Sequence, residues 1–241
     1  FAIAISTVVY PLIAKHAVEK HYDAMAADYL KGIRLILVIN IPAAAGLMLL
    51  SEPIVRFLYQ RGHFTAADTA MMAPLLAFFC LGLPFFSIVS LTVRAFYSFK
   101  DTATPVKVAA VDFCVNFGLS LLLMRWFSEL GLVLASTTAI IVQTILLQRA
   151  LAKKLPSMSL RPLLPSLGKI ALGTLGMSLA VYGGWRLLGQ LYPGSRLNDV
   201  IAIFALIPLG VAIYGGLLWI LRIEGREEFA AMLGRFRRRS A

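Results

Sequence analysis

The stretch FYSFKDTATPVK, Phe96–Lys107, is a polar segment between two long apolar runs. Asp101 and Thr102 are residue types that cap helices, and Pro105 follows where the first turn of a new helix would lie. The runs on both sides approach about 20 residues, the length that crosses the hydrocarbon core of a bilayer. The segment therefore predicts a short hinge between two membrane-spanning helices, and the side of the membrane it faces orients every other loop.

The composition of the whole chain is that of an integral membrane protein. Of its 241 residues, 59% are hydrophobic and 15% are charged, whereas about a quarter are charged in a typical soluble domain. The mean hydropathy is +0.81. The net charge of +11 is compatible with nucleic-acid binding or with basic loops on a membrane protein. The charges lie between apolar runs rather than on one soluble face, which favours the loops.

Working outward from the hinge, we expect an all-α protein with seven transmembrane helices. The first run is short and begins without Met, so we expect the chain to be the C-terminal part of a longer protein. Gly82 and Pro84 interrupt the third run. Ser51–Thr65 has apolar residues at helical spacing and predicts a short interfacial helix, and Thr65–Asp68 resembles a capping box. The expected spans are Phe1–Ala14, Leu35–Leu50, Met71–Phe96, Val106–Trp126, Leu130–Leu151, Leu167–Leu191 and Val200–Ile223.

The basic residues are distributed unequally over the two sides that these spans define. One side holds five of the 23 Lys and Arg residues, and the other side holds the remaining 18. Short cytoplasmic loops carry the excess of Lys and Arg in membrane proteins. The distribution predicts that the Phe96–Lys107 hinge and the C-terminus are cytoplasmic, and that the loop around Arg61 faces outward. The five residues on the outer side are Arg56, Arg61, Arg125, Arg186 and Arg196.

Residues that could carry catalysis or hold a metal are few. His16, His21 and His63 fall in polar segments with no acidic or cysteine partner at metal-ligand spacing. Cys80 and Cys114 lie within apolar runs, as core thiols do. No motif for a nucleophile or a phosphate-binding glycine loop occurs. We therefore expect neither an enzyme nor a bound cofactor or structural metal.

Polar residues inside the spans are the more informative feature. Asp112, Asn116 and Ser120 share one face of the fourth span, and Thr138 belongs to a polar group in the fifth. A carboxylate within a bilayer is costly and marks a cavity or a partner. Oxygen ligands of these types suit a hard cation such as Na⁺, but hydrogen bonding between helices explains them as well. Gly176, Ala180 and Gly184 form a stripe of small residues, which is typical of a helix contact.

Several of these segments together resemble the MurJ/MviN family of lipid II flippases. The combination of an outer RGxFT-like loop with an inner FYxxxDTxTPV hinge is specific, whereas each piece alone would be weak. The similarity extends over Phe1–Leu151 by motif and beyond that by the pattern of spans. The motifs are AISTVVYPLIAKHA at 4–17, LYQRGHFTAADT at 58–69, LGLP at 81–84, RAFYSFKDTATPVK at 94–107 and GLVLAST at 131–137.

The resemblance implies a fourteen-helix transporter of the MOP exporter superfamily, with two six-helix lobes around a cavity and two extra C-terminal helices. This chain would supply spans eight to fourteen. Residues 1–151 would form the C-terminal lobe without its first span, 152–223 the two extra helices and 224–241 a basic cytoplasmic tail. The implied activity is movement of lipid II from the inner to the outer leaflet of the bacterial inner membrane by alternating access. The chain alone would be inactive, because its partner is the missing N-terminal half.

The resemblance also implies roles for particular residues. Arg94, Asp101, Thr102 and Pro105 would form a cytoplasmic gate or hinge. Asp112, Asn116, Ser120 and Thr138 would form an ion site for Na⁺ coupling, and coupling to the membrane potential is the alternative. The outer-loop motif comprises Arg61, Gly62, Phe64 and Thr65. A groove for the lipid tail would lie at Gly176, Ala180 and Gly184.

A second kind of transporter and a protein of a different class remain open on the sequence alone, and an integral-membrane enzyme is a further option that the lack of paired acids or histidines disfavours. Another MOP exporter would carry lipid-linked oligosaccharide or drugs. A seven-helix receptor or membrane scaffold would have the same number of spans.

Overall fold

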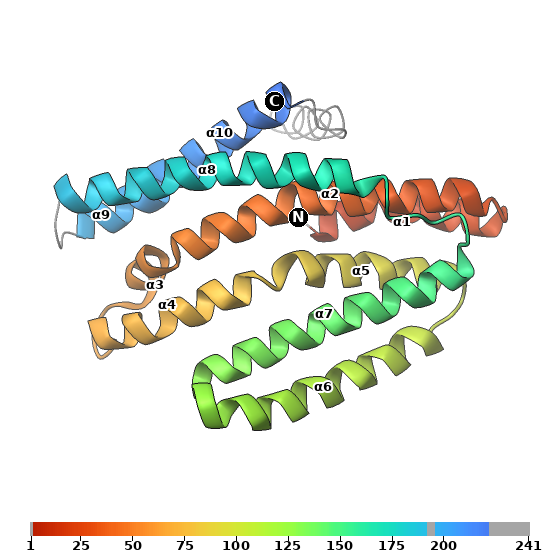
Figure 1. Cartoon of the computed structure of the whole chain (residues 1–241), viewed down its shortest axis with the longest axis horizontal. Helices are drawn as coiled ribbons and strands as arrows, with labels where there is room; N and C mark the ends of the chain where they lie inside the picture. The colour runs from red at the N-terminus through yellow and green to blue at the C-terminus, as the bar shows by residue number, and fades with distance from the viewer. Residues whose placement is uncertain (1, 192–195, 222–241) are drawn as a thin grey trace.

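A computed structural model describes residues 2–191 and 196–221, which form helices joined by short turns (Figure 1). The expected all-α fold is confirmed. The helices of the lobe are α1 (Ala2–Val18), α2 (Tyr22–Leu49), α3 (Ser51–Tyr59), α4 (Ala66–Cys80), α5 (Leu83–Ser98), α6 (Ala103–Phe127) and α7 (Glu129–Lys154). The C-terminal pair consists of α8 (Leu163–Leu191) and a last span made of α9 (Arg196–Ile201), the π-helical turn η1 (Ala202–Leu206) and α10 (Ile207–Ile220).

Five described helices are long and apolar enough to cross a membrane: α2, α6, α7, α8 and the last span. A sixth span results if α4 and α5 are counted together, because they are separated by a short break with a 40° bend. The expected interruption at Gly82 and Pro84 is thus confirmed. Proline has no N–H to donate to the carbonyl of Cys80, so a continuous helix cannot pass this point unbent. The seventh span stays a prediction, since α1 has 17 described residues.

The second span begins earlier than the hydropathy alone indicates. We expected an apolar span at Leu35–Leu50 that the helix-forming residues before it extend, and α2 begins at Tyr22. The additional turns contain charged residues but also bury Met25 and Tyr29 completely. The helix therefore continues because one face of this charged segment packs against the protein, which average hydropathy does not detect.

Two hydrophobic cores hold the molecule together, and α2 contributes to both. The first core joins α1, α2, α5 and α7, and the second joins α2 to α8 and the last span. Tyr214 in α10 donates a hydrogen bond to the carbonyl of Val38 in α2, with an O–O distance of 2.8 Å. The C-terminal pair is thereby attached to the lobe along α2, as Figure 1 shows.

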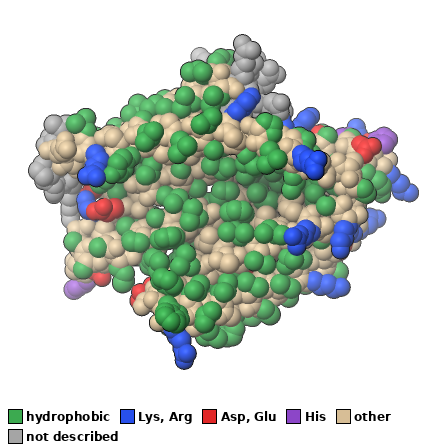
Figure 2. Space-filling view, in the orientation of Figure 1, with side chains coloured by type: hydrophobic (Ala, Val, Ile, Leu, Met, Phe, Trp, Pro, Cys, Tyr) green, Lys and Arg blue, Asp and Glu red, His purple; other side chains and the backbone are tan. Residues whose placement is uncertain are grey.

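We call the end of the molecule that holds the Arg61–Thr65 loop the outer end, and the end that holds the Phe99–Thr102 turn the inner end. The loops between α2 and α4 and between α6 and α7 lie at the outer end, on the left of Figure 1. Figure 2 shows apolar side chains over the middle of one face, with many Lys and Arg side chains toward the inner end. This is the distribution of a protein whose middle zone lies in lipid.

Candidate functional site

The outer-loop motif joins α3 to α4 in a tight turn. Gly62 has a φ of +62°, a conformation that residues with a side chain rarely adopt. The backbone N–H of Phe64 donates to the carbonyl of Arg61 at 3.2 Å. Thr65 and Asp68 form the expected capping box at the start of α4. The motif therefore sets the geometry of the turn and the start of the helix.

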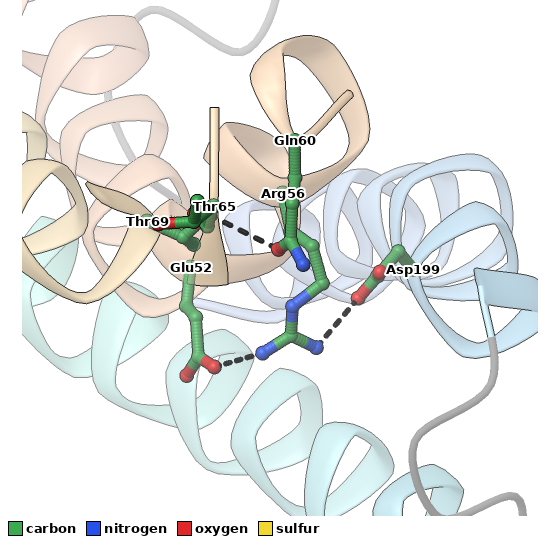
Figure 3. Close-up of polar contacts among 6 residues, drawn as sticks. All are labelled: Glu52, Arg56, Gln60, Thr65, Thr69 and Asp199. Atoms are coloured by element: carbon green, nitrogen blue, oxygen red, sulfur yellow. Dashed lines mark hydrogen bonds and ion pairs between the residues drawn. The ribbon is translucent and has the colours of Figure 1, made fainter. Parts of the chain in front are cut away.

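Beside this loop lies a polar cluster that links α3, α4 and the last span (Figure 3). Arg56 donates one hydrogen bond to Asp199 at 3.2 Å and another to Glu52. The side chain of Asp199 is 3% exposed. Thr69 in α4 donates to the side-chain carbonyl of Gln60, the residue after the end of α3, at 3.1 Å. We call Glu52, Arg56 and Asp199 the outer clasp, because they join α3 to the last span.

Two cavities flank Arg56 and Gln60 at the outer end. The smaller, of about 420 Å³, separates the polar face of α3 from α4. The larger, of about 720 Å³, lies between α3, the loop at Arg61 and the start of the last span. On the α4 side the smaller cavity is lined by Ala66, Thr69, Ala70, Ala73 and Pro74.

Sequence reasoning placed Arg56 only on the outer side and did not find its partner. The two residues of the ion pair are 143 positions apart. The available signal was Asp199 itself, a carboxylate at the start of an apolar run, where charge is costly unless it is paired.

At the inner end, Asp101 organises the turn between α5 and α6. Its carboxylate accepts hydrogen bonds from the backbone N–H of Thr104 at 3.0 Å and from the Thr104 hydroxyl at 2.7 Å. It also forms an ion pair with Lys154 at the end of α7, at 2.8 Å. These donors, the Lys154 ammonium first, hold the pKa of Asp101 well below its usual range.

The other residues of the expected inner gate have different surroundings. Thr102 is exposed and makes no capping hydrogen bond through its side chain, so Asp101 supplies the cap. Pro105 is buried in the first turn of α6. Arg94 in α5 is half-buried, and its side chain has no ion pair among the residues that the structure describes.

The polar residues of α6 and α7 are brought together only in part. Asn116 donates to the hydroxyl of Ser136 at 3.3 Å, and Ser120 donates to the side-chain carbonyl of Asn116 at 3.1 Å. Thr138 is exposed and does not join this group, so Ser136 is the contribution of α7. Asp112 is half-buried one turn away and has no hydrogen-bond or ion-pair partner within residues 2–191 and 196–221.

A buried hydrogen-bond network inside the lobe was not expected from the sequence. The Tyr29 hydroxyl lies 2.8 Å from the Thr92 hydroxyl, and Gln148 donates to both. Tyr29 and Thr92 are both 0% exposed. The network ties α2, α5 and α7 to one another near the inner end, and its members are uncharged, so the sequence carries little signal for it.

The stripe of small residues on α8 faces the last span. A Cβ atom added at Gly176 would lie 2.8 Å from Leu217, and one added at Gly184 would lie 2.6 Å from Leu206. A side chain at either position would force the tip of the facing leucine side chain to shift. The contact is one of close helix packing, and Ala180 between them is half-buried.

The fold and these polar groups define a multi-pass α-helical membrane protein. The helices are interrupted within a span, and polar side chains lie inside the apolar segments, as is typical of membrane transporters. Within the described ranges, no group of three or more His, Cys, Asp or Glu side chains could hold a metal ion.

Comparison with known proteins gives the family. The family model "Lipid II flippase MurJ" matches residues 1–198. The probable lipid II flippase MurJ of Haemophilus influenzae is 30% identical over 93% of this chain and 45% of its own length. That of Rhizobium tropici is 36% identical over 57% of this chain and 26% of its own length. The chain belongs to the lipid II flippase MurJ family.

A solved structure supports the same assignment. This chain is similar to a lipid II flippase MurJ in an inward closed conformation, with a TM-score of 0.73 and 26% identity. The match covers 95% of this chain and 44% of the solved one. The chain therefore spans less than half the length of these relatives. The family is named for a transport activity and not for an enzymatic conversion.

Proposed function

We propose that this chain forms part of a flippase that moves lipid II from the inner to the outer leaflet of the bacterial inner membrane. The observation that carries the proposal is the family match over residues 1–198, supported by the fold similarity to a lipid II flippase. Because the chain covers less than half of its relatives, the activity belongs to a longer protein. Residues 1–151 supply one wall of the central cavity, and the missing N-terminal half supplies the other.

The test is genetic rescue. A full-length gene that contains this chain should restore growth to cells depleted of their own lipid II flippase. Residues 1–241 expressed alone should not restore growth, because one wall cannot enclose the substrate. Failure of the full-length protein to rescue, when it is present in the membrane at normal levels, would contradict the proposal. Rescue by residues 1–241 alone would contradict the division into two required halves.

We further propose that transport proceeds by alternating access, with the inner end of the lobe facing the cytoplasm. The excess of Lys and Arg at the inner end supports this orientation. The turn at Asp101, joined to the end of α7 through Lys154, supports a fixed geometry for the inner gate. The expected basic tail at 224–241 lies outside the described residues.

Coupling to Na⁺ is the proposed energy source, with Asp112, Asn116, Ser120 and Thr138 as the predicted set. The half-buried carboxylate of Asp112, beside the hydrogen-bonded Asn116 and Ser120, supports an ion site at α6. The exposure of Thr138 favours Ser136 as its α7 member.

The Na⁺ dependence of flipping separates this proposal from simple helix packing. Asp112→Asn should abolish the dependence of flipping rate on Na⁺ concentration, because the amide supplies no charge. Asn116→Ala should weaken it as well. If Asn116→Ala lowers thermal stability while both variants keep the wild-type Na⁺ dependence, these residues only join helices and the membrane potential is the better candidate.

A further inference from the structure

The outer end of the lobe contains a fixed part, made by α3 and the start of the last span. The outer clasp connects them. The rings of Phe57 in α3 and Phe204 in η1 also pack edge to face, with their centroids 6.1 Å apart. The ion pair with Arg56 holds a carboxylate that is only 3% exposed, and losing a pair at a buried position is unfavourable. The last span is itself held to α2 and α8 by the second hydrophobic core. We call α3 and residues 196–206 the outer platform.

Helix α4 contacts α2, α3 and α7, and Thr137 in α7 donates to the carbonyl of Phe78 at 3.4 Å, but its packing uses smaller side chains than that of α5. Its buried residues are Thr69, Ala73 and Cys80, which are small or polar. Neither core includes a residue of α4, within the part of the chain that the structure describes. By contrast, α5 buries Ile88, Leu91 and Phe96 in the first core. The two halves of this broken span therefore differ in how strongly packing holds them.

The space around α4 leaves room for movement. The cavity of about 420 Å³ lies between α4 and the platform helix α3, and α4 lines it with small side chains, three of them alanine. The hydrogen bond from Thr69 to Gln60 crosses from α4 to the residue after the end of α3. At its other end α4 meets the break, where Leu81 and Gly82 form hydrogen bonds to carbonyls three residues earlier and Pro84 donates none.

We propose that α4 is an outer flap that pivots at Leu81–Gly82 while the outer platform stays fixed. The inner part of the lobe cannot follow the movement, because the Tyr29–Thr92–Gln148 network and the first core hold α2, α5 and α7 together. Closing the flap onto α3 narrows the cavity, and opening it breaks the Thr69–Gln60 hydrogen bond. On the proposed function, on which this role rests, the flap opens the outer exit for the lipid headgroup.

Two pairs of aromatic residues allow a matched cross-linking test. Phe57 and Phe204 join parts of the platform, whereas Phe79 and Phe86 lie on either side of the break, with ring centroids 5.9 Å apart. All four side chains are exposed on the protein surface, and the reagent is membrane-permeant because the break lies within an apolar span. Each pair is replaced by cysteines in the full-length protein, with Cys80 and Cys114 changed to alanine. Flipping is then measured before and after a short bifunctional thiol reagent is added.

The link between positions 57 and 204 should change the flipping rate less than twofold. The link between positions 79 and 86 should lower it at least tenfold, and cleavage of the linker should restore it. A block by the 57–204 link would show that the platform itself must open. Unchanged flipping with the 79–86 link would show that the break does not move. Either result overturns the proposal.

Spin labels provide a readout that does not depend on transport of lipid II. Met71 on α4 and Leu58 on α3 are both exposed, as is Tyr97 at the inner end of α5. The distance distribution between labels at 71 and 97 should be clearly broader than that between labels at 58 and 97. Equal widths overturn the flap. Failure of genetic rescue with a broad 71–97 distribution would instead reject the proposed function and keep the flap.

Discussion

Asp101 illustrates how one side chain can fix the start of a membrane helix. Its carboxylate accepts two hydrogen bonds from Thr104 in the first turn of α6 and pairs with Lys154 at the end of α7. The Lys154 ammonium also lies over the rings of Phe96 and Phe99, at 6.0 and 5.6 Å. Asp101 therefore caps α6 and, through Lys154, attaches it to α7. Its role is to fix the geometry of the inner end.

The depressed pKa of Asp101 gives a prediction about stability and pH. The carboxyl titrates near pH 4 in an unfolded chain and lower in the folded protein. Its contribution to stability is therefore complete above about pH 4 and is lost as the pH falls through the folded-state pKa. Asp101→Asn should lower the melting temperature at pH 7 by about 2–4 °C, the shift expected for an interaction of about 1 kcal/mol.

Melting curves of the detergent-purified protein between pH 7 and pH 3 check this expectation. The difference between wild type and Asp101→Asn should shrink as the pH falls below about 4. Thr102→Ala is the control, because the Thr102 side chain makes no capping hydrogen bond. A difference that stays constant with pH would mean that the carboxylate charge is not the stabilising feature.

Sequence reasoning at the residue scale succeeded where partners are close in the chain. The Thr65–Asp68 capping box and the cap near Asp101 depend on residues three positions apart, so local spacing is sufficient. It did not find Lys154 or Asp199 as partners, since those contacts depend on where distant helices end. Nor could local spacing show which residue of α7 lies beside Asn116, and in the structure it is Ser136. One residue along α7 separates the exposed Thr138 from Thr137, which is buried.

At the scale of elements, packing between α8 and the last span explains why this helix pair is rich in small residues. Gly176 and Gly184 face Leu217 and Leu206, respectively. A Cβ atom added at Gly183 would have no neighbouring atom within 4 Å. Glycine is otherwise unfavourable within a helix, by about 1 kcal/mol relative to alanine. The close contact at Gly184 is thus a reason for glycine that does not apply at Gly183.

The adjacent glycines provide a matched pair of substitutions. Gly184→Leu should destabilise the protein by about 1–3 kcal/mol through overpacking against Leu206. Gly183→Leu should leave stability unchanged or raise it by up to about 1 kcal/mol, because a better helix former enters open space. Thermal melting measures both. A predicted lipid-tail groove at this stripe would give the opposite pattern for Gly184→Leu, with impaired flipping and an unchanged melting temperature.

The elements themselves were predictable to different degrees. The hydropathy pattern indicated α6, α7 and α8 within a few residues, and the Gly82 and Pro84 signals indicated the break between α4 and α5. Helix-forming residues before Leu35 indicated that α2 extends upstream, although hydropathy did not locate its start at Tyr22. The π-helical turn was missed. Pro208 leaves the carbonyl of Phe204 without its usual helical donor, and the turn at Ala202–Leu206 lies directly before it.

At the scale of the whole molecule, the two hydrophobic cores hold different parts of the protein together. The core of α1, α2, α5 and α7 holds the inner part of the lobe, and the core around α8 attaches the C-terminal pair. Among the described residues, α6 contributes no buried residue to either core and only the partly buried Val108 packs against the first, and many of its large apolar side chains are exposed, as suits a helix in contact with lipid. These long-range arrangements depend on which helix faces pack against each other. The number and length of the spans do not determine that packing.

The names of the outer and inner ends depend on how the whole chain is oriented in the membrane. The excess of Lys and Arg predicts that the loop at His63 is outside and the loop at Ser157 is cytoplasmic. Single cysteines at these exposed positions, His63→Cys and Ser157→Cys, are introduced with Cys80 and Cys114 changed to alanine. A membrane-impermeant maleimide added to intact spheroplasts should label position 63, and should label position 157 only after permeabilisation. The reverse pattern would place the Asp101 turn outside and make the proposed flap a cytoplasmic one.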